Sequence, residues 1–286
     1  MYPRPFEYAR AESIDQALDL KSQTGGRFIA GGHSILPMMK IRMTAPDTLV
    51  DIGRIDELRG ISSNGGFSVG ALTTHAMVAS EEGAGFPAAL KEAASMIGDP
   101  QVRNRGTVGG NVAHADPASD LPTVFSALGA TMKAKSKDGS RDIPAIDFFT
   151  GLFESALSDD EILTAVEVGA EGSNTGSAYA KLFNPASRYA VVGACATVDV
   201  GDDGSCTSAS VAVGGLTAAA LVLDAVSDAI VGKPITEENA KNAAQTAVDA
   251  VGDNVMGDVY AGAEYRKRML PVFVRRALLA AAERAG

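Results

Sequence analysis

The N-terminal part of the chain alternates short apolar runs with polar capping residues in the order strand, helix, strand. A capping box that opens at Ser13 predicts a short amphipathic helix. Apolar runs over residues 27–30 and 47–52 predict strands. Between them, Ser34 is placed to cap a helix over residues 35–40. The pattern therefore predicts a small βαβ unit, and such units bind ligands at the carboxyl ends of their strands.

The middle of the chain predicts short strands and helices in a less regular order. Thr74 is placed to cap a helix, and Ser119 or Asp120 can cap another. Asp138-Gly139 between two apolar runs predicts a hairpin. The other expected elements are strands near residue 61 and over 67–70, 130–135, 141–143 and 161–168, and a helix over 86–97.

The C-terminal part predicts an antiparallel meander followed by two long helices. Apolar runs separated by turn residues predict the strands, and Pro271 is expected to bend or restart the last helix. The strands are expected over residues 178–182, 194–200 and 208–213, and the helices over 236–251 and 263–284. A basic cluster on the last helix is expected to face solvent or a partner, and it comprises Arg266, Lys267, Arg268, Arg275 and Arg276.

Composition and charge exclude several functional classes. The chain has 46% hydrophobic residues but no apolar run long enough to span a membrane, and its formal net charge of −10 disfavours nucleic acid as a partner. The N-terminus lacks the apolar core of a signal peptide, so we expect a cytoplasmic protein with free thiols at Cys195 and Cys206. Two cysteines are too few for an iron–sulfur cluster. The three histidines, His33, His75 and His114, lack the spacing of a metal site.

Two glycine-rich stretches are candidate ligand-binding segments. The first glycine segment is residues 30–34, Ala-Gly-Gly-His-Ser, and the second is residues 106–111, Gly-Thr-Val-Gly-Gly-Asn. Glycine lets a ligand approach the backbone, whose N–H groups can then converge on an anion. A simple turn between strands would explain either stretch alone. Together they suit a ligand with two phosphates better than either does alone.

With these segments in place, the chain resembles the FAD-binding medium subunits of molybdenum hydroxylases. It is most similar to the carbon monoxide dehydrogenase type and more distantly to the flavin region of xanthine dehydrogenase. The resemblance spans essentially the whole chain. Its most specific parts are the first glycine segment, the block Pro100-Gln-Val-Arg-Asn-Arg-Gly-Thr-Val-Gly-Gly-Asn111 and the ending Glu264-Tyr-Arg-Lys-Arg268.

The resemblance implies an α+β fold with two domains. The FAD-binding domain would cover residues 1–175, with a small βαβ part over about 1–57 and a mixed or antiparallel sheet part over 58–175. A C-terminal domain over residues 176–286 would contain a three-stranded antiparallel sheet with helices.

The resemblance also implies a set of FAD-binding residues. The two glycine segments would hold the pyrophosphate and the ribityl chain, and Asp120 matches an acidic flavin contact. Leu163 and Lys181 match neighbours of the flavin ring, and Tyr189 matches an aromatic residue near the isoalloxazine. The full implied set is Ala30, Gly31, Gly32, His33, Ser34, Ile97, Thr107, Gly109, Gly110, Asn111, Asp120, Leu163, Lys181 and Tyr189.

Each of these residues also has a purely structural interpretation. His33 can hydrogen-bond a backbone group, and Asp120 can cap a helix. Lys181 can be a surface residue of a strand, and Tyr189 can be an ordinary core or surface residue. The two apolar members of the set would be core residues in most proteins.

Three residues close to the implied FAD-binding set in sequence lie outside it. His114 and Asp116 lie just beyond the second glycine segment and are expected to support it. Arg188 departs from the family pattern, because many relatives carry an aspartate before the matching tyrosine. The departure leaves the FAD assignment intact, but it leaves the final electron acceptor and the substrate subclass open.

The function implied by the resemblance is that of a relay subunit. An iron–sulfur small subunit would pass electrons from a molybdenum large subunit to FAD on this chain, in a dimer of heterotrimers. The molybdenum cofactor and the [2Fe-2S] clusters are expected on these partners, with no catalytic or metal-ligating residue on this chain. Two alternatives stay open: a self-sufficient flavin oxidase or reductase, and a non-catalytic nucleotide-binding scaffold.

Overall fold

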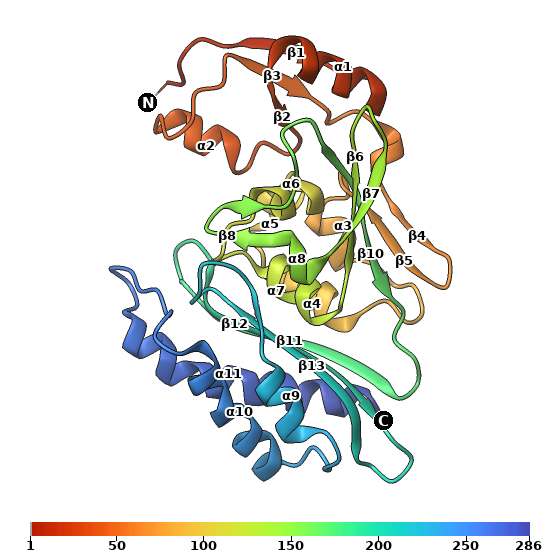
Figure 1. The fold of residues 1–286 in the computed structure, drawn as a ribbon, viewed down its shortest axis with the longest axis vertical. Coiled ribbons are helices and arrows are strands. Elements are labelled where there is room, and N and C mark those ends of the chain that lie inside the picture. The colour runs from red at the N-terminus through yellow and green to blue at the C-terminus, as the bar shows by residue number, and fades with distance from the viewer. Residues whose placement is uncertain (1) are drawn as a thin grey trace.

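The computed structural model describes residues 2–286 and shows three main sheets stacked along the long axis of the molecule (Figure 1). The N-terminal unit lies at one end, the C-terminal sheet with its helices lies at the other, and a five-stranded sheet lies between them. The fold is α+β, as the sequence predicts. Within residues 2–286, none of the helices combines the length and the apolar character that a bilayer crossing requires.

The N-terminal unit is a three-stranded parallel sheet with strand order β1-β3-β2, and it confirms the predicted βαβ arrangement. Ser13 caps α1 as predicted, because its Oγ accepts a hydrogen bond from the Gln16 amide at 3.2 Å. The sequence pattern misses β1, whose mostly exposed polar residues show no apolar alternation. The elements are β1 (Glu7–Arg10), α1 (Ile14–Thr24), β2 (Arg27–Ile29), α2 (Ile35–Lys40) and β3 (Thr48–Asp51).

The middle of the molecule is built on an antiparallel sheet with strand order β4-β5-β10-β6-β7, as predicted. The predicted hairpin connects β6 and β7, and Thr74 caps α3 as expected, accepting from the Met77 amide at 3.3 Å. The elements are η1 (Asp56–Leu58), β4 (Ile61–Ser63), β5 (Gly66–Gly70), α3 (His75–Ala79), α4 (Ala88–Met96), α5 (Pro100–Arg103), α6 (Val108–His114), α7 (Asp120–Ala127), β6 (Thr131–Lys135), β7 (Ser140–Pro144), α8 (Ala145–Phe148), β8 (Phe149–Gly151), β9 (Glu154–Ser155) and β10 (Ile162–Gly169).

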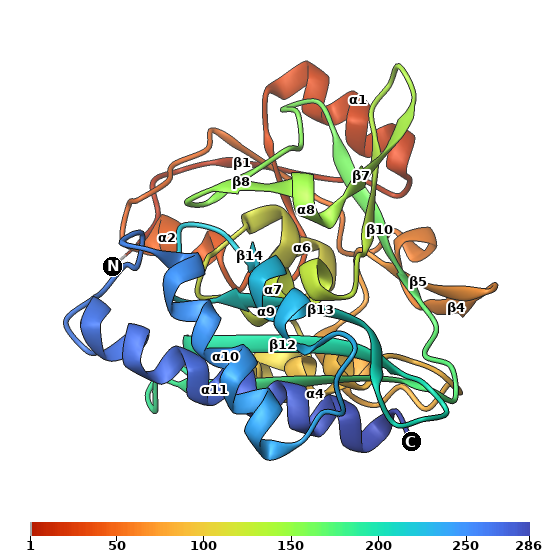
Figure 2. The same ribbon diagram turned by 60° about the horizontal axis from the view of Figure 1, so that its bottom comes forward.

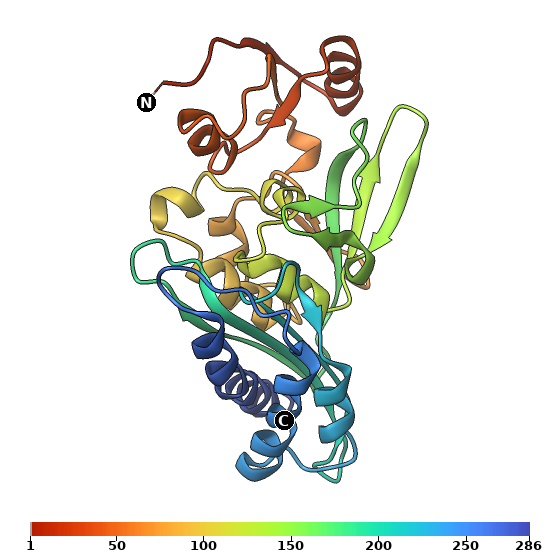
Figure 3. The ribbon, with the colours of Figure 1, turned by 60° about the vertical axis from the view of Figure 1, so that its left-hand side comes forward.

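The C-terminal sheet is covered by helices on both faces (Figures 2 and 3). Helices α4 and α7 pack on one face, and α9 and α11 pack on the other, with α10 against α9 and α11. Burial on both faces explains the nearly continuous apolar run of β12. The three predicted strands are confirmed, and the pattern misses α9 and the short strand β14. The elements are β11 (Thr175–Phe183), β12 (Ala190–Val200), β13 (Cys206–Gly214), β14 (Leu221–Val222), α9 (Asp224–Ile230), α10 (Glu237–Val251) and α11 (Ala263–Arg284).

The last helix corrects one expectation in part and another at a single residue. It runs from Ala263 to Arg284 as one element with Pro271 inside it, so the helix does not restart at Pro271. Arg266 is only 5% exposed, so the predicted solvated basic side is wrong at this residue. Its guanidinium donates to the carbonyl oxygen of Val191 at 3.1 Å and pairs with Asp258 at 2.5 Å. Arg266 therefore ties α11 to the sheet and to the preceding loop.

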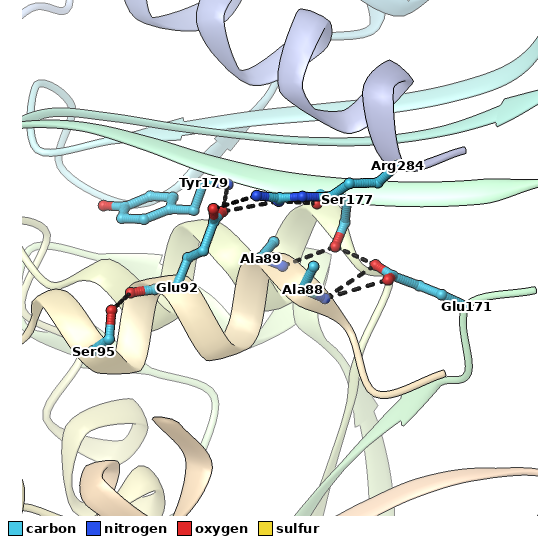
Figure 4. A network of polar contacts seen from close by, with 8 residues as sticks. All are labelled: Ala88, Ala89, Glu92, Ser95, Glu171, Ser177, Tyr179 and Arg284. Atoms are coloured by element: carbon cyan, nitrogen blue, oxygen red, sulfur yellow. Dashed lines mark hydrogen bonds and ion pairs between the residues drawn. The ribbon is translucent and has the colours of Figure 1, made fainter. Parts of the chain in front are cut away.

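A network of polar contacts joins the end of α11 to α4 and β11 (Figure 4). Arg284 Nη2 lies 2.5 Å from Glu92 Oε1, and Arg284 Nη1 donates to the Ser177 carbonyl oxygen at 2.6 Å. Glu92 Oε2 also accepts from the Tyr179 amide at 2.9 Å. The Ser177 hydroxyl donates to Glu171. The network fixes the C-terminal sheet against the middle of the molecule.

We expect Arg284→Gln to lower the free energy of unfolding by about 1–2 kcal/mol, because the pair is charged and only about one-third exposed. Urea denaturation of the purified protein measures the change. Arg268→Gln is the matched control, since Arg268 and Glu264 form an exposed pair on the same helix. The control should change the value by no more than about 0.5 kcal/mol. Equal losses in the two variants would contradict the assigned role.

Candidate functional site

A cavity of about 380 Å³ brings the predicted site residues together. Its wall draws residues from the N-terminal unit, from the middle sheet and its helices, and from the loop after β11. Thirteen of the fourteen predicted residues line it, and the remaining one, Lys181, lies behind Asp120. The lining members are Ala30, Gly31, Gly32, His33, Ser34, Ile97, Thr107, Gly109, Gly110, Asn111, Asp120, Leu163 and Tyr189.

The first glycine segment follows β2 at the carboxyl end of the parallel sheet, where α/β units bind ligands. Gly32 has a φ of +75°, a conformation that glycine adopts without strain. His33 Nδ1 lies 2.9 Å from the Gly31 carbonyl oxygen, so His33 makes the backbone hydrogen bond of its structural interpretation and also lines the cavity. Ser34 is the N-cap residue of α2 as predicted, but within residues 2–286 its side chain makes no capping hydrogen bond.

The amides of the first glycine segment are available to a ligand. Among residues 2–286, the N–H groups of Gly32, His33 and Ser34 donate to no protein acceptor. All three residues line the cavity. Successive unpaired amides around a left-handed glycine form a concavity that suits an anion. This segment therefore fits a phosphate group.

The second glycine segment uses its amides within the protein. Its second half is the start of α6 rather than a loop, so the turn interpretation is wrong there. The Val108 amide donates to the Thr73 carbonyl oxygen at 2.9 Å, and the Gly110 amide donates to Thr107 Oγ1 at 3.1 Å. Thr107 and Asn111 remain on the cavity wall as polar side chains.

Glycine is required in both segments by close packing inside the protein. A Cβ atom at Gly31 would overlap the carbonyl oxygen of Arg105. A Cβ atom at Gly109 would lie 2.5 Å from the Cβ atom of Ala71. Gly31 of the first segment therefore packs directly against the backbone of Arg105 and Gly106, where the second segment begins.

A buried ion pair lies at the polar wall of the cavity. Lys181 Nζ lies 2.7 Å from Asp120 Oδ2, and the two side chains are 0% and 5% exposed. Burial raises the pKa of Asp120 and lowers the pKa of Lys181. The Asp120 carboxylate binds Lys181 and Tyr179, so a helix cap does not describe it. Lys181 is not a surface residue.

The remaining predicted contacts form the apolar and aromatic parts of the wall. Leu163 is 4% exposed and belongs to the core as well as to the cavity wall. Ile97 follows α4, and Tyr189 is 45% exposed at the cavity. Partial enclosure raises the pKa of Tyr189 to about 12, with further contributions from Asp116 and Asp120. Tyr189 is therefore a neutral phenol at neutral pH.

His75 lines the cavity, although the sequence does not mark it as a candidate FAD-binding residue. It is 3% exposed, and within residues 2–286 its Nδ1 has no hydrogen-bond partner. Burial and the nearby His33 and Arg103 lower its pKa to about 4, so the ring is neutral at pH 7. The signal available in the sequence is its position directly after the helix cap Thr74.

His114 and Asp116 lie where they were expected, beside the second glycine segment. His114 lines the cavity, and its ring centroid lies 5.2 Å from that of Phe153 with the two ring planes tilted by 39°. Asp116 Oδ1 accepts from the Ala118 amide at 2.9 Å and shapes the turn before α7. Across residues 2–286, no group of three or more metal-ligating side chains comes together.

Two family models match the chain. One is described as the FAD binding domain in molybdopterin dehydrogenase and matches residues 4–170. The other is described as the CO dehydrogenase flavoprotein C-terminal domain and matches residues 177–281. Together they cover nearly the whole chain.

Curated relatives match over nearly their full length. The carbon monoxide dehydrogenase medium chain of Hydrogenophaga pseudoflava is 36% identical, over 98% of each chain. The 6-hydroxypseudooxynicotine dehydrogenase complex subunit alpha of Paenarthrobacter nicotinovorans is 34% identical, over 100% of this chain and 97% of the relative. Relatives of nearly equal similarity thus carry names with different substrates.

Solved structures agree. A carbon monoxide dehydrogenase structure from Hydrogenophaga pseudoflava contains a chain that matches with a TM-score of 0.94 and 36% identity, over 100% of both chains. Quinoline 2-oxidoreductase from Pseudomonas putida 86 contains a chain that matches with a TM-score of 0.91 and 30% identity, over 100% of this chain and 99% of that chain.

Proposed function

Because the chain belongs to the family of FAD-binding medium subunits of molybdopterin dehydrogenases, which includes the carbon monoxide dehydrogenase medium chains, we propose that it is the FAD-carrying electron-transfer subunit of a molybdenum hydroxylase complex. The observation that carries the proposal is the cavity wall. Three unpaired amides of the first glycine segment lie on the same cavity as the buried carboxylate of Asp120.

The residues present fit FAD. The amides of Gly32, His33 and Ser34 would donate to the pyrophosphate, and Thr107 and Asn111 would bind polar groups beside it. Asp120 would accept a hydrogen bond from an N–H of the isoalloxazine or a hydroxyl of the ribityl chain. Bound FAD would supply one- and two-electron chemistry, and the protein would orient it and limit its access to solvent.

The partners follow from what the chain lacks in sequence. Its two cysteines are too few for an iron–sulfur cluster, so electrons would reach FAD from an iron–sulfur small subunit. Substrate oxidation would take place on a molybdenum large subunit, and we propose a dimer of heterotrimers. The substrate belongs to that large subunit, which agrees with the variety of substrates in the names of the relatives.

Two further parts of the proposal concern domains and location. We propose a boundary near residue 175, between an FAD-binding domain and a C-terminal domain, which agrees with the limits of the two family matches. We also propose a cytoplasmic complex, since Cys195 and Cys206 are free buried thiols among the described residues.

The test is purification from the native host, with flavin, iron and molybdenum analysis of the purified complex. We expect FAD on this chain and iron and molybdenum on two co-purifying chains. A chain that takes up no FAD would overturn the proposal and favour a non-catalytic scaffold. Reduction of the isolated FAD-loaded chain by a small organic substrate would instead support a self-sufficient flavin oxidoreductase.

Tyr189→Ala should weaken FAD binding only about two- to tenfold, because a stacked aromatic contact contributes roughly 0.5–1.5 kcal/mol. The same change should speed reoxidation of the reduced flavin by oxygen, since one side of the ring loses its cover. Stopped-flow reoxidation and FAD titration measure both effects. Tyr265→Ala, at an exposed tyrosine of α11, is the control. Parental binding and reoxidation in Tyr189→Ala would show that the tyrosine does not lie at the flavin.

A further inference from the structure

Tyr179 lies behind Asp120 and belongs to none of the assigned contacts. Its hydroxyl donates to Asp120 Oδ1 at 2.6 Å, while Lys181 holds Oδ2 at 2.7 Å. Tyr179 is 3% exposed and lies outside the cavity lining. Each carboxylate oxygen can accept more than one hydrogen bond. Asp120 therefore keeps acceptor capacity toward the cavity while two donors hold it from behind.

Tyr179 is held at its backbone amide and at its hydroxyl. Its backbone amide donates to Glu92, which is itself held by Arg284 in the network of Figure 4. At the ring end, Gly193 on β12 leaves room for the hydroxyl, because a Cβ atom there would overlap it. Tyr179 pairs with Cys195 across the same two strands. The hydroxyl thus lies between Gly193 and the Asp120 carboxylate.

We propose that Tyr179 is a positioning residue that keeps the Asp120 carboxylate ionised and oriented toward the bound flavin. This inference rests on the proposed FAD function. A hydrogen bond to the charged form of a carboxyl group favours that form. Tyr179 and Lys181 therefore oppose the effect of burial, which raises the pKa of Asp120.

Other titratable groups near Asp120, Tyr179 and Lys181 are the same in the parent and in the variants described below. Within residues 2–286, none of these groups hydrogen-bonds to the Asp120 carboxylate oxygens, which accept from Tyr179 and Lys181. Because these groups are unchanged, the comparison isolates the Tyr179 hydroxyl. They are Glu92 on α4, Cys195 on β12, Asp116 in the turn before α7, and Arg188 and Tyr189 in the loop after β11.

The experiment is a pH titration of the flavin absorbance in the full chain loaded with FAD. Tyr179→Phe should bind FAD and raise the midpoint of the Asp120-dependent absorbance change by about one to two pH units, the size of a lost hydrogen bond to a charged group. Asp120→Asn should lose this change and so assign it. A purely structural role for Tyr179 would lower the melting temperature without moving the midpoint.

Gly193→Ala provides an independent test, because it displaces the hydroxyl while keeping the tyrosine, and the midpoint should again rise. Tyr265→Phe is the control, because it removes an exposed hydroxyl far from Asp120 in sequence and should keep the parental midpoint. A parental midpoint in FAD-loaded Tyr179→Phe or Gly193→Ala would overturn this inference alone. A parent that binds no FAD would overturn the proposed function and this inference with it.

Discussion

Lys181→Met is expected to lower the free energy of unfolding by about 3–5 kcal/mol, the largest stability loss that we predict for a single substitution. Methionine fills a similar volume but leaves the Asp120 carboxylate buried without a counter-charge. Breaking a buried pair from one side costs this much because the remaining charge is desolvated and uncompensated. Both side chains are almost fully buried, so solvent screening offers little relief.

The loss in Lys181→Met should depend on pH with a defined sign. Burial raises the pKa of Asp120 in the folded protein above its unfolded value of about 3.9. The folded variant therefore takes up a proton where the unfolded chain has none, and stability rises as the pH falls. The deficit is complete above the folded-state pKa of Asp120 and shrinks as the pH falls below it.

Urea denaturation of the FAD-free proteins at several pH values measures this effect, since bound FAD would stabilise them differently. Adding Asp120→Asn to Lys181→Met removes the buried charge and should recover most of the loss, which a double-mutant cycle quantifies. Lys133→Met is the control, because Lys133 pairs with exposed Asp142 and should cost about 1 kcal/mol or less. Equal losses for the two lysines, independent of pH, would refute the buried-charge explanation.

Local signals explain how much of the fold the sequence predicts. The capping box at Ser13, the cap at Thr74 and the turn at Asp138-Gly139 act over a few residues, and the structure confirms all three. β1 depends on pairing with β3, about 40 residues away, and its own residues give no apolar pattern. Sequence patterns therefore locate elements that are defined locally and miss those defined by a distant partner.

The candidate site likewise combines features with local sequence signals and features that depend on distant partners. The glycine segments are visible in the sequence, but glycine's low helix propensity hides the start of α6. The pair of Asp120 and Lys181 joins residues 61 positions apart, so only the fold reveals that each neutralises the other. Arg266 looked like a solvated residue because its partners are backbone carbonyls of distant strands and loops. In each of these cases the residue's role depends on tertiary packing rather than on its neighbours in sequence.

Gly31→Ala is expected to weaken FAD binding at least tenfold, although it adds a single methyl group. The new Cβ atom would overlap the Arg105 carbonyl oxygen and lie 3.1 Å from the Cα atom of Gly106. Both are backbone atoms, so no side-chain rotation relieves the contact and the two glycine segments must separate. The unpaired amides after Gly31 would then move away from Thr107 and Asn111 across the cavity.

The same overlap should lower the free energy of unfolding by about 1–3 kcal/mol, the usual cost of overpacking. FAD titration by fluorescence and urea denaturation without FAD separate the two effects. Gly169→Ala is the matched control, because a Cβ atom there meets nothing within 4 Å. It should leave both measurements at the parental values. Parental FAD affinity in Gly31→Ala would mean that the contact between the glycine segments does not set the geometry of the binding cavity.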